Sequence, residues 1–413
     1  MKVKLITFVI FFTLSVQFVF AGGFQLNEHN ARAMAMGGAF TAISNDPSAI
    51  YFNAAGLTQL SGINFMLGTT MIAPTFSFRG VSPNVTETDA AKQTFFPTHF
   101  FASYSYNKDL AFGLGFTSPF GLASQWPSDW VGRYLAVETK LQTFIITPEV
   151  AYNLFDNLSV SAGLIYSFAT VTISQKSPQT PFAGDAFTTL NGNANSAWGF
   201  DLGALYKPTP DLSFGVSFHS QVKYTFKGTA TTTGASQLAS ALPNGSASAD
   251  LTTPLNLAVG VAYRIIPELL LSADFQYVGW SSYDTLTVDF ASPKMVQSSP
   301  RLYDNSYILR FGGEYSLLED LKVRAGIYYD KDPVKPQYLN PSLPDADRLG
   351  FSFGLGYKLA NNLNVDAAYL FIRGSQLTVT NSMENYSQGI SPFNGTYNTA
   401  ANLVSLTLSY GIQ

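Results

Sequence analysis

The chain has 413 residues, of which only 12% are charged, whereas 15% are aromatic and 33 residues are glycine. An ordinary soluble domain carries about 25% charged residues, so a surface of this composition would be poorly solvated in water. The net charge of −4 argues against a nucleic-acid partner, and the absence of cysteine excludes a disulfide framework and thiol chemistry.

The first predicted element is a cleavable secretory signal in residues 1–21. Lys2 and Lys4 precede an apolar run that ends at a small residue, Ala21, and this layout is typical of signal peptides. A membrane-anchor helix is the alternative, but polar residues interrupt the run. No later stretch approaches the roughly 18 apolar residues of a spanning helix, so a membrane location requires a closed β-barrel.

Residues 22–61 are too few for a domain and do not alternate like strands, whereas residues 62–413 contain a repeat. Six tyrosines are each followed six residues later by a leucine, with turn-forming or acidic residues between them. The tyrosines are Tyr104, Tyr152, Tyr206, Tyr263, Tyr315 and Tyr357. After each turn apolar residues occupy every second position, as from Leu158 to Leu164, which is the period of a strand with unlike faces.

Long segments rich in Thr, Ser, Asn, Gly and Pro separate these units and are predicted as loops. They are 80–93, 177–195, 228–250, 331–347 and 374–399. Short turns on one side and long loops on the other, with tyrosines at the turns, indicate an outer-membrane barrel with an aromatic girdle. We therefore predict an all-β, transmembrane antiparallel β-barrel of about 14 strands.

Several segments resemble the FadL/TodX family of outer-membrane transporters for long-chain fatty acids and hydrophobic compounds. In the N-terminal part they are 23–28, 35–40 and 45–57, and further on they are 130–134, 280–284 and 343–348. The resemblance implies a fourteen-stranded barrel whose lumen is plugged by an N-terminal hatch, here residues 22–61. It also implies a loop groove that captures ligand, a deeper pocket lined partly by the N-terminus, and a kinked third strand that opens the wall sideways.

Two groups of hatch residues follow from this resemblance. Phe24 and Leu26 are candidates for the deep pocket. Asn53, Ala54 and Ala55 occupy the place of the family's Asn-Pro-Ala hatch motif, with Ala54 instead of the proline. Because proline would fix φ and remove a donor, the stiffness of this turn is in question.

The lateral-opening kink is predicted at Gly121. The third strand is expected at 110–118 and continues into Pro119, which cannot donate to a sheet ladder, and Gly121, which tolerates a break in it. A bulky β-branched residue at Gly121 is therefore expected to slow uptake.

An apolar cluster in the loop that follows is the candidate for ligand capture, because it is expected to face water. The cluster comprises Phe120, Leu122, Trp126, Trp130, Tyr134 and Leu135. Alternatively, these rings belong to the outer aromatic girdle or pack against another loop. Arg133 could bind a carboxylate head group or tie the loop to the rim through a neighbouring acid. Both alternatives stay open, whereas the inward-facing charges of the barrel are expected to pair with one another and with the hatch.

The predicted function is passive transport of long-chain fatty acids or other hydrophobic molecules across a Gram-negative outer membrane, without a cofactor. The ligand is expected to leave either through a gap in the wall or past a rearranged hatch. A monomer among outer-membrane lipids is expected, inserted by the barrel-assembly machinery. A general porin is the alternative and would lack the plug. An outer-membrane lipase is less favoured, because none of His29, His99 and His219 lies in a catalytic motif. Apolar pockets discriminate weakly, so the sequence does not identify the substrate.

Overall fold

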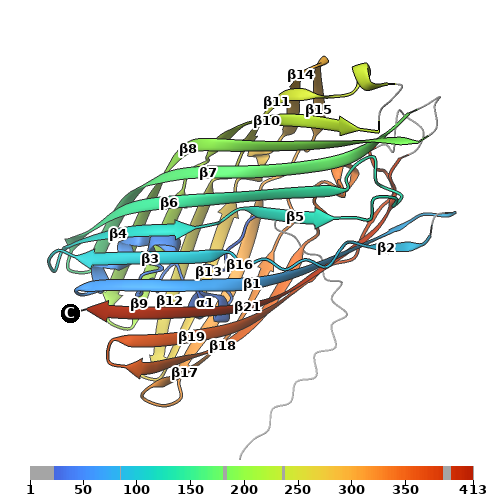
Figure 1. The fold of residues 1–413 in the computed structure, drawn as a ribbon. Helices are drawn as coiled ribbons and strands as arrows, with labels where there is room; N and C mark the ends of the chain where they lie inside the picture. The colour runs from blue at the N-terminus through green and yellow to red at the C-terminus, as the bar shows by residue number, and fades with distance from the viewer. Residues whose placement is uncertain (1–22, 84, 180–183, 235–237, 385–391, 413) are drawn as a thin grey trace, which may run out of the picture.

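The computed structural model describes residues 23–83, 85–179, 184–234, 238–384 and 392–412, and within it the chain forms a closed antiparallel barrel of fourteen strands (Figure 1). The barrel strands are β1 (Ile63–Gly80), β3 (Thr98–Ser105), β4 (Leu110–Thr117), β6 (Glu138–Phe155), β7 (Leu158–Pro178), β8 (Asp185–Thr209), β9 (Leu212–His219), β12 (Asn256–Ile266), β13 (Leu269–Val278), β16 (Ser306–Ser316), β17 (Leu321–Asp330), β18 (Arg348–Ala360), β19 (Leu363–Gly374) and β21 (Gly395–Ile412). Strand β1 pairs with β3 on one side and β21 on the other, which closes the ring. The predicted fold class and strand number are confirmed. The predicted signal peptide lies outside the described residues.

Each of the six predicted short turns joins two neighbouring barrel strands. They connect β3 to β4, β6 to β7, β8 to β9, β12 to β13, β16 to β17 and β18 to β19. All six tyrosines before the turns are between 41% and 50% exposed, which suits an aromatic ring at the boundary between hydrocarbon and water. No helix in the described ranges is long and apolar enough to cross a membrane.

On the loop side the sheet continues beyond the barrel. The additional strands are β2 (Glu87–Asp89), β5 (Gly121–Gln125), β10 (Lys223–Thr233), β11 (Gly245–Thr252), β14 (Thr285–Ala291), β15 (Lys294–Pro300) and β20 (Leu377–Val379), with short helical turns η2 (Ala239–Ala241), η3 (Trp280–Ser282) and η4 (Pro336–Tyr338). Segments 177–195 and 228–250, which we predicted as loops, are largely strand, because β8 runs on to pair with β7 and β10, and β10 pairs with β11. Their Thr and Asn residues form cross-strand hydrogen bonds, such as Thr188 with Thr232 at 2.8 Å.

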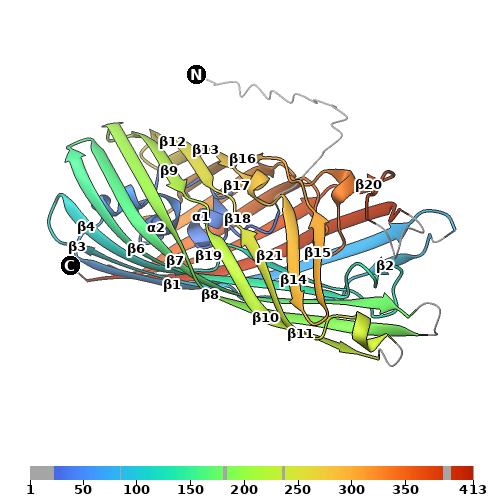
Figure 2. The same cartoon turned by 90° about the horizontal axis from the view of Figure 1, so that it is seen from above.

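The chain before β1, from residue 23 to 61, lies within the barrel, and we call it the hatch segment (Figures 1 and 2). It contains α1 (Ala31–Ala35), α2 (Ala49–Phe52) and the 3₁₀ helix η1 (Ala54–Gln59). Helix α1 contacts β17, β18, β19 and β21, whereas η1 contacts β4, β6, β7 and β8 on the other side of the lumen. Gly37, with a φ of +66°, lets the chain turn where an added Cβ would lie 3.0 Å from the Ile327 backbone.

Candidate functional site

The third barrel strand is interrupted, because β4 ends at Thr117 and its continuation β5 begins at Gly121. The hatch segment supplies backbone partners at this interruption. Leu26 N donates to Pro119 O at 2.8 Å and Gly121 N donates to Phe24 O at 3.0 Å. The N-terminal residues therefore satisfy Pro119 O and Gly121 N, two of the backbone groups at the break.

Beside this interruption the barrel wall has a gap. Strand β4 pairs with β3 as far as Phe116 opposite Phe100, whereas β5 pairs with β6. Contact across this part of the wall resumes where Ala91 N donates to Gln125 O at 2.7 Å. Between these two points the edges face each other without a backbone hydrogen bond among the described residues. We call this opening the wall gap.

An apolar cavity of about 340 Å³ connects the hatch segment with the wall gap. Phe24 and Leu26 line it from the hatch. Its lining on the two edges of the gap consists of Phe95, Phe96, Pro97 and Thr98 on one side and Ser118, Phe120, Gly121, Leu122 and Ala123 on the other. It also reaches Gln142 and Phe144 of β6, which alternate with the buried Thr143 and therefore face outward. The cavity thus extends from the lumen to the outer surface.

Aromatic rings from the loop side fix the hatch end of this cavity. Phe24 packs edge-on against Trp280 at 4.8 Å, Tyr283 at 5.8 Å and Phe120 at 6.0 Å between ring centroids. The backbone N–H of Gly23 donates to Asp345, and its carbonyl accepts from Arg348 at 2.8 Å. The first described residues, Gly23 and Phe24, are therefore held by two segments of the loop side that are far apart in sequence.

A family profile described as outer membrane protein transport protein, OMPP1/FadL/TodX, matches residues 12–411. The chain belongs to this family. It is 27% identical over 402 residues to an outer membrane protein of Neisseria meningitidis, and the match covers 86% of each chain. It is 25% identical over 394 residues to the long-chain fatty acid transport protein of Salmonella typhi, and this match covers 87% of the present chain and 89% of the relative. The crystal structure of a Pseudomonas aeruginosa FadL homologue superimposes with a TM-score of 0.86 at 25% identity, covering 95% of this chain and 100% of that one. The Pseudomonas putida toluene transporter TodX, with a TM-score of 0.74, 17% identity and coverage of 94% and 99%, shows the same fold.

Family membership and the barrel place this protein in the outer membrane of a Gram-negative cell, as predicted. The family comprises transporters of fatty acids and hydrophobic aromatic compounds. The segments that carried the resemblance meet in the structure: Phe24 of the FadL-like N-terminus lies against Trp280 and Tyr283, and Gly23 binds Asp345 and Arg348.

The hatch motif at Asn53 ties the hatch to itself and to the wall. The Asn53 side-chain amide donates to Thr41 O at 3.0 Å and to Ala204 O of β8 at 2.9 Å, and its oxygen accepts from Ala55 N at 3.3 Å. Asn53 thus caps η1, in which Ala54 is the first residue. The turn keeps its hydrogen bonds although the family's proline is absent.

Replacing Ala54 by proline is expected to stabilise the protein by about 0.4–1 kcal/mol, because proline at the first position of a helix restricts the unfolded chain. Asn53 before it is extended, with φ −170° and ψ 97°, and is thus outside the α region that proline disfavours for the preceding residue. The check is thermal unfolding of the purified mature protein in detergent. A lower midpoint for Ala54→Pro than for wild type would show that the buried turn has no room for the ring.

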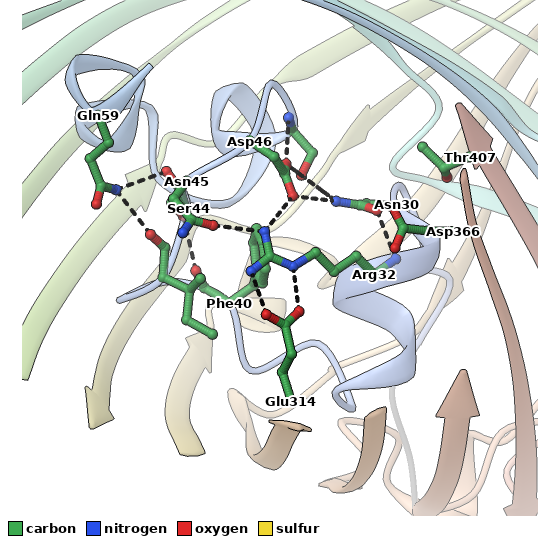
Figure 3. Close-up of polar contacts among 12 residues, drawn as sticks. Asn30, Arg32, Phe40, Ser44, Asn45, Asp46, Gln59, Glu314, Asp366 and Thr407 are labelled. Atoms are coloured by element: carbon green, nitrogen blue, oxygen red, sulfur yellow. Dashed lines mark hydrogen bonds and ion pairs between the residues drawn. The ribbon is translucent and has the colours of Figure 1, made fainter. Parts of the chain in front are cut away.

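On the turn side of the lumen an ion-pair network binds the hatch to the wall (Figure 3). Arg32 of α1 donates through Nε to Glu314 of β16 at 2.8 Å and lies 3.3 Å from Asp46. Arg324 of β17 also donates to Glu314, at 2.7 Å, and Lys322 does so at 3.0 Å. These contacts confirm the expected pairing for Glu314, Lys322 and Arg324, whereas the carboxylate oxygens of Glu149, another inward-facing charge, have no hydrogen-bond partner among the described residues.

Most of the loop residues predicted for ligand capture do not line the apolar cavity. Trp126 and Trp130 stack at 4.2 Å between centroids and are 2% and 4% exposed, with Trp126 Nε1 donating to Pro341 O at 2.9 Å. The two rings therefore pack against another loop, which was the alternative prediction for this cluster. Only Phe120 and Leu122 of this cluster line the cavity.

Arg133 ties its loop to a neighbouring acidic residue, which was one of the two predicted alternatives. Its Nε donates to Asp185 at 3.0 Å, and its Nη2 donates to the Tyr134 hydroxyl at 2.7 Å. Burial alone would lower the pKa of Arg133, but the hydrogen bond to Asp185 and the neighbouring Tyr134 and Asp185 charges outweigh it and raise the pKa above its ordinary value. A role for Trp126, Trp130, Arg133 and Tyr134 in capture stays a prediction.

Sequence reasoning did not assign Trp280, Tyr283, Tyr328, Asp330 or Arg348 to the site. Trp280, Tyr283 and Arg348 lay within the segments that carried the family resemblance, which was a usable signal. Tyr328 and Asp330 lie at the end of an ordinary alternating strand, and only the folded barrel brings them to the cavity.

A hydrolase-like arrangement lies elsewhere in the lumen. Ser217 Oγ lies 3.3 Å from His219 Nε2, and His219 Nδ1 contacts Asp201. Strand β9, which carries Ser217, pairs with β8 and β12 on both sides, so its backbone N–H groups are not available as an oxyanion hole.

We therefore expect that a fluorophosphonate probe does not label Ser217 in the folded protein. Mass spectrometry of the treated protein checks this. Labelling that disappears in Ser217→Ala would contradict this and support a lipase. No group of three or more metal-binding side chains occurs in the described part of the chain.

Proposed function

We propose that this protein carries long-chain fatty acids or similar hydrophobic molecules passively across the outer membrane. Ligand is captured among the loops, enters the cavity beside Phe24 and leaves sideways through the wall gap into the membrane. Residues 1–21 act as the export signal, 22–61 as the hatch and 62–413 as the barrel. The protein works as a monomer surrounded by outer-membrane lipids, after insertion by the barrel-assembly machinery.

One observation carries this proposal: the apolar cavity is lined both by Phe24 inside the barrel and by Phe96 and Phe144 at the outer wall. Burying an acyl chain releases about 0.8 kcal/mol per CH₂ group, so capture needs no energy source. Release of the bound acyl chain into water is the harder step, because it reverses this gain. A path that ends in the hydrocarbon of the membrane avoids transfer of the chain to water. The relative from Salmonella typhi, named a long-chain fatty acid transport protein, supports this substrate class.

The test is uptake of labelled oleate by a Gram-negative host that lacks its own fatty-acid transporter, with surface location of the expressed chain verified. We expect uptake to be restored. If oleate uptake is absent while small sugars pass freely through the folded barrel, the porin alternative replaces this proposal.

A further inference from the structure

A single lysine lies at the mouth of the wall gap. Among the described residues of β6 and of the two gap edges that line the apolar cavity, Lys140 is the one charged side chain. The acidic residues of the cavity, Glu28 and Asp330, belong to the hatch segment and to β17. Arg348, the other cation of the lining, donates to Gly23 of the hatch segment. Lys140 is therefore the cation at the outer end of the cavity.

The side chain of Lys140 points to the outer face of the barrel. Its neighbours Thr139 and Leu141 are buried, and side chains alternate between the two faces of a strand. Lys140 lies opposite Ala123 of β5, which forms one edge of the gap and has only a methyl group there. Adjacent strands are about 4.8 Å apart, so the long side chain of Lys140 can extend over Ala123 to the opening.

The ammonium group of Lys140 is available to a ligand. It makes no hydrogen bond or ion pair with a described residue, and it is not fully enclosed by protein. Glu138 lies two positions away on the same face of β6 and forms no ion pair with it. An anionic group that reaches the wall gap can therefore pair with Lys140 without displacing an existing partner.

Lys140 also lies at the level of the polar head groups of the membrane. Tyr152 marks the turn-side boundary on the same strand, and Lys140 is twelve positions before it. A tilted spanning strand needs about 9–11 residues, so Lys140 lies just beyond the hydrocarbon on the loop side. Phe144, four positions closer to the turns, lies within the hydrocarbon.

These features fit a fatty acid that leaves the barrel sideways. Its acyl chain is stabilised against Phe96 and Phe144 at the outer wall, whereas its carboxylate is costly to bury in hydrocarbon. An ammonium group at the boundary can hold the carboxylate in the polar layer by a charge-assisted hydrogen bond while the chain passes the gap. A neutral hydrophobic molecule has no charge that needs such a partner.

We propose that Lys140 binds the carboxylate head group of a fatty acid at the mouth of the wall gap and positions the molecule for exit into the outer leaflet. The inference rests on the proposed function and deepens it. Lys140 is thus a positioning residue that gives the gap a preference for long-chain carboxylates over neutral molecules of the same length.

The test compares the initial uptake rates of labelled oleate and labelled oleyl alcohol in the transporter-deficient host. Rates are measured at matched surface expression, after subtraction of the rate in cells without the protein. Lys140→Gln is expected to slow oleate uptake about fivefold, the size of a surface ion pair, and to leave oleyl alcohol uptake unchanged. Lys140→Arg keeps the charge and should transport oleate at the wild-type rate.

Lys227→Gln provides a matched control. Lys227 is an exposed lysine of β10 on the loop side, and it does not line the cavity. Its replacement lowers the charge of the protein by the same amount as Lys140→Gln. Oleate uptake by Lys227→Gln should therefore equal that of wild type.

The possible outcomes separate this inference from the proposed function. Absence of oleate uptake by the wild-type protein overturns both. Unchanged oleate uptake in Lys140→Gln, or an equal loss in Lys227→Gln, overturns the role of Lys140 and leaves hydrophobic transport standing. An equal loss for oleate and oleyl alcohol also overturns that role, because it would show that Lys140 binds a lipid phosphate or shapes the gap rather than holding the carboxylate of the ligand.

Discussion

Replacing Gly121 by isoleucine is expected to slow oleate uptake by about 5- to 150-fold, the equivalent of the 1–3 kcal/mol that overpacking costs. Gly121 lines the cavity at the edge of the wall gap, and a Cβ added there would lie 3.0 Å from Leu26 Cδ1. Because the nearest atom is the end of a flexible side chain, the barrel should still fold. The larger branched side chain would fill the passage between the hatch and the wall. The measurement is the initial rate of labelled oleate uptake at matched surface expression.

Gly313 provides a matched control for this substitution. It is also a barrel-strand glycine, and a Cβ there would lie 3.0 Å from Leu271 Cδ2, but it does not line the cavity. Gly313→Ile should therefore leave uptake near the wild-type rate. Equal rates for Gly121→Ile and wild type would show that ligand does not leave through the wall gap.

Replacing Glu314 by leucine is expected to release the hatch from the wall and open the lumen to small polar solutes. The change removes the shared acceptor of Arg32 and Arg324, and breaking a buried ion pair in this way costs about 3–5 kcal/mol. The open fraction should then rise about 100-fold or more, since about 1.4 kcal/mol corresponds to a factor of ten. Conductance of single barrels in planar bilayers measures this directly.

Two further variants separate hatch release from a damaged wall. Arg32→Gln cuts the network on the hatch side and keeps the contacts of Arg324 and Lys322 with Glu314, so it should also increase conductance. Arg264→Gln breaks an exposed pair with Asp211, whose atoms are 4.0 Å apart, and should change nothing. Closed barrels in both Glu314→Leu and Arg32→Gln would mean that this network does not hold the hatch.

The barrel was predictable because its signals are local and repeated. The tyrosines before the six turns and the alternation after them fix the strands, and Pro119 with Gly121 indicates the break between β4 and β5. The strand extensions were not predictable, because residues such as Thr188 and Thr232 read as loop until β8 and β10 lie side by side. In that case tertiary pairing overrides weak local preference.

The site residues were predictable only in the segments that resemble the family or adjoin them. The resemblance supplied Phe24, Leu26 and Gly121, which the structure brings together in one cavity. The exposure of Trp126 and Trp130 was inferred from their place in a loop, but loops can bury rings against one another, as these two residues do. Asp330 could not be assigned to the cavity from sequence, because only the folded barrel brings the end of β17 to it.

The most direct test of lateral passage is photoaffinity labelling with a long-chain fatty acid that carries a diazirine near its methyl end, followed by peptide mapping of the labelled protein in outer membranes. We expect adducts on peptides that contain Phe24 and Leu26 and on those that contain Phe96 and Phe144, which together line the cavity from hatch to outer wall. A separate cavity on the turn side is lined by Asp46, Pro47 and Leu60. Adducts there, with none at Phe96 or Phe144, would contradict lateral exit and show that ligand passes through the hatch.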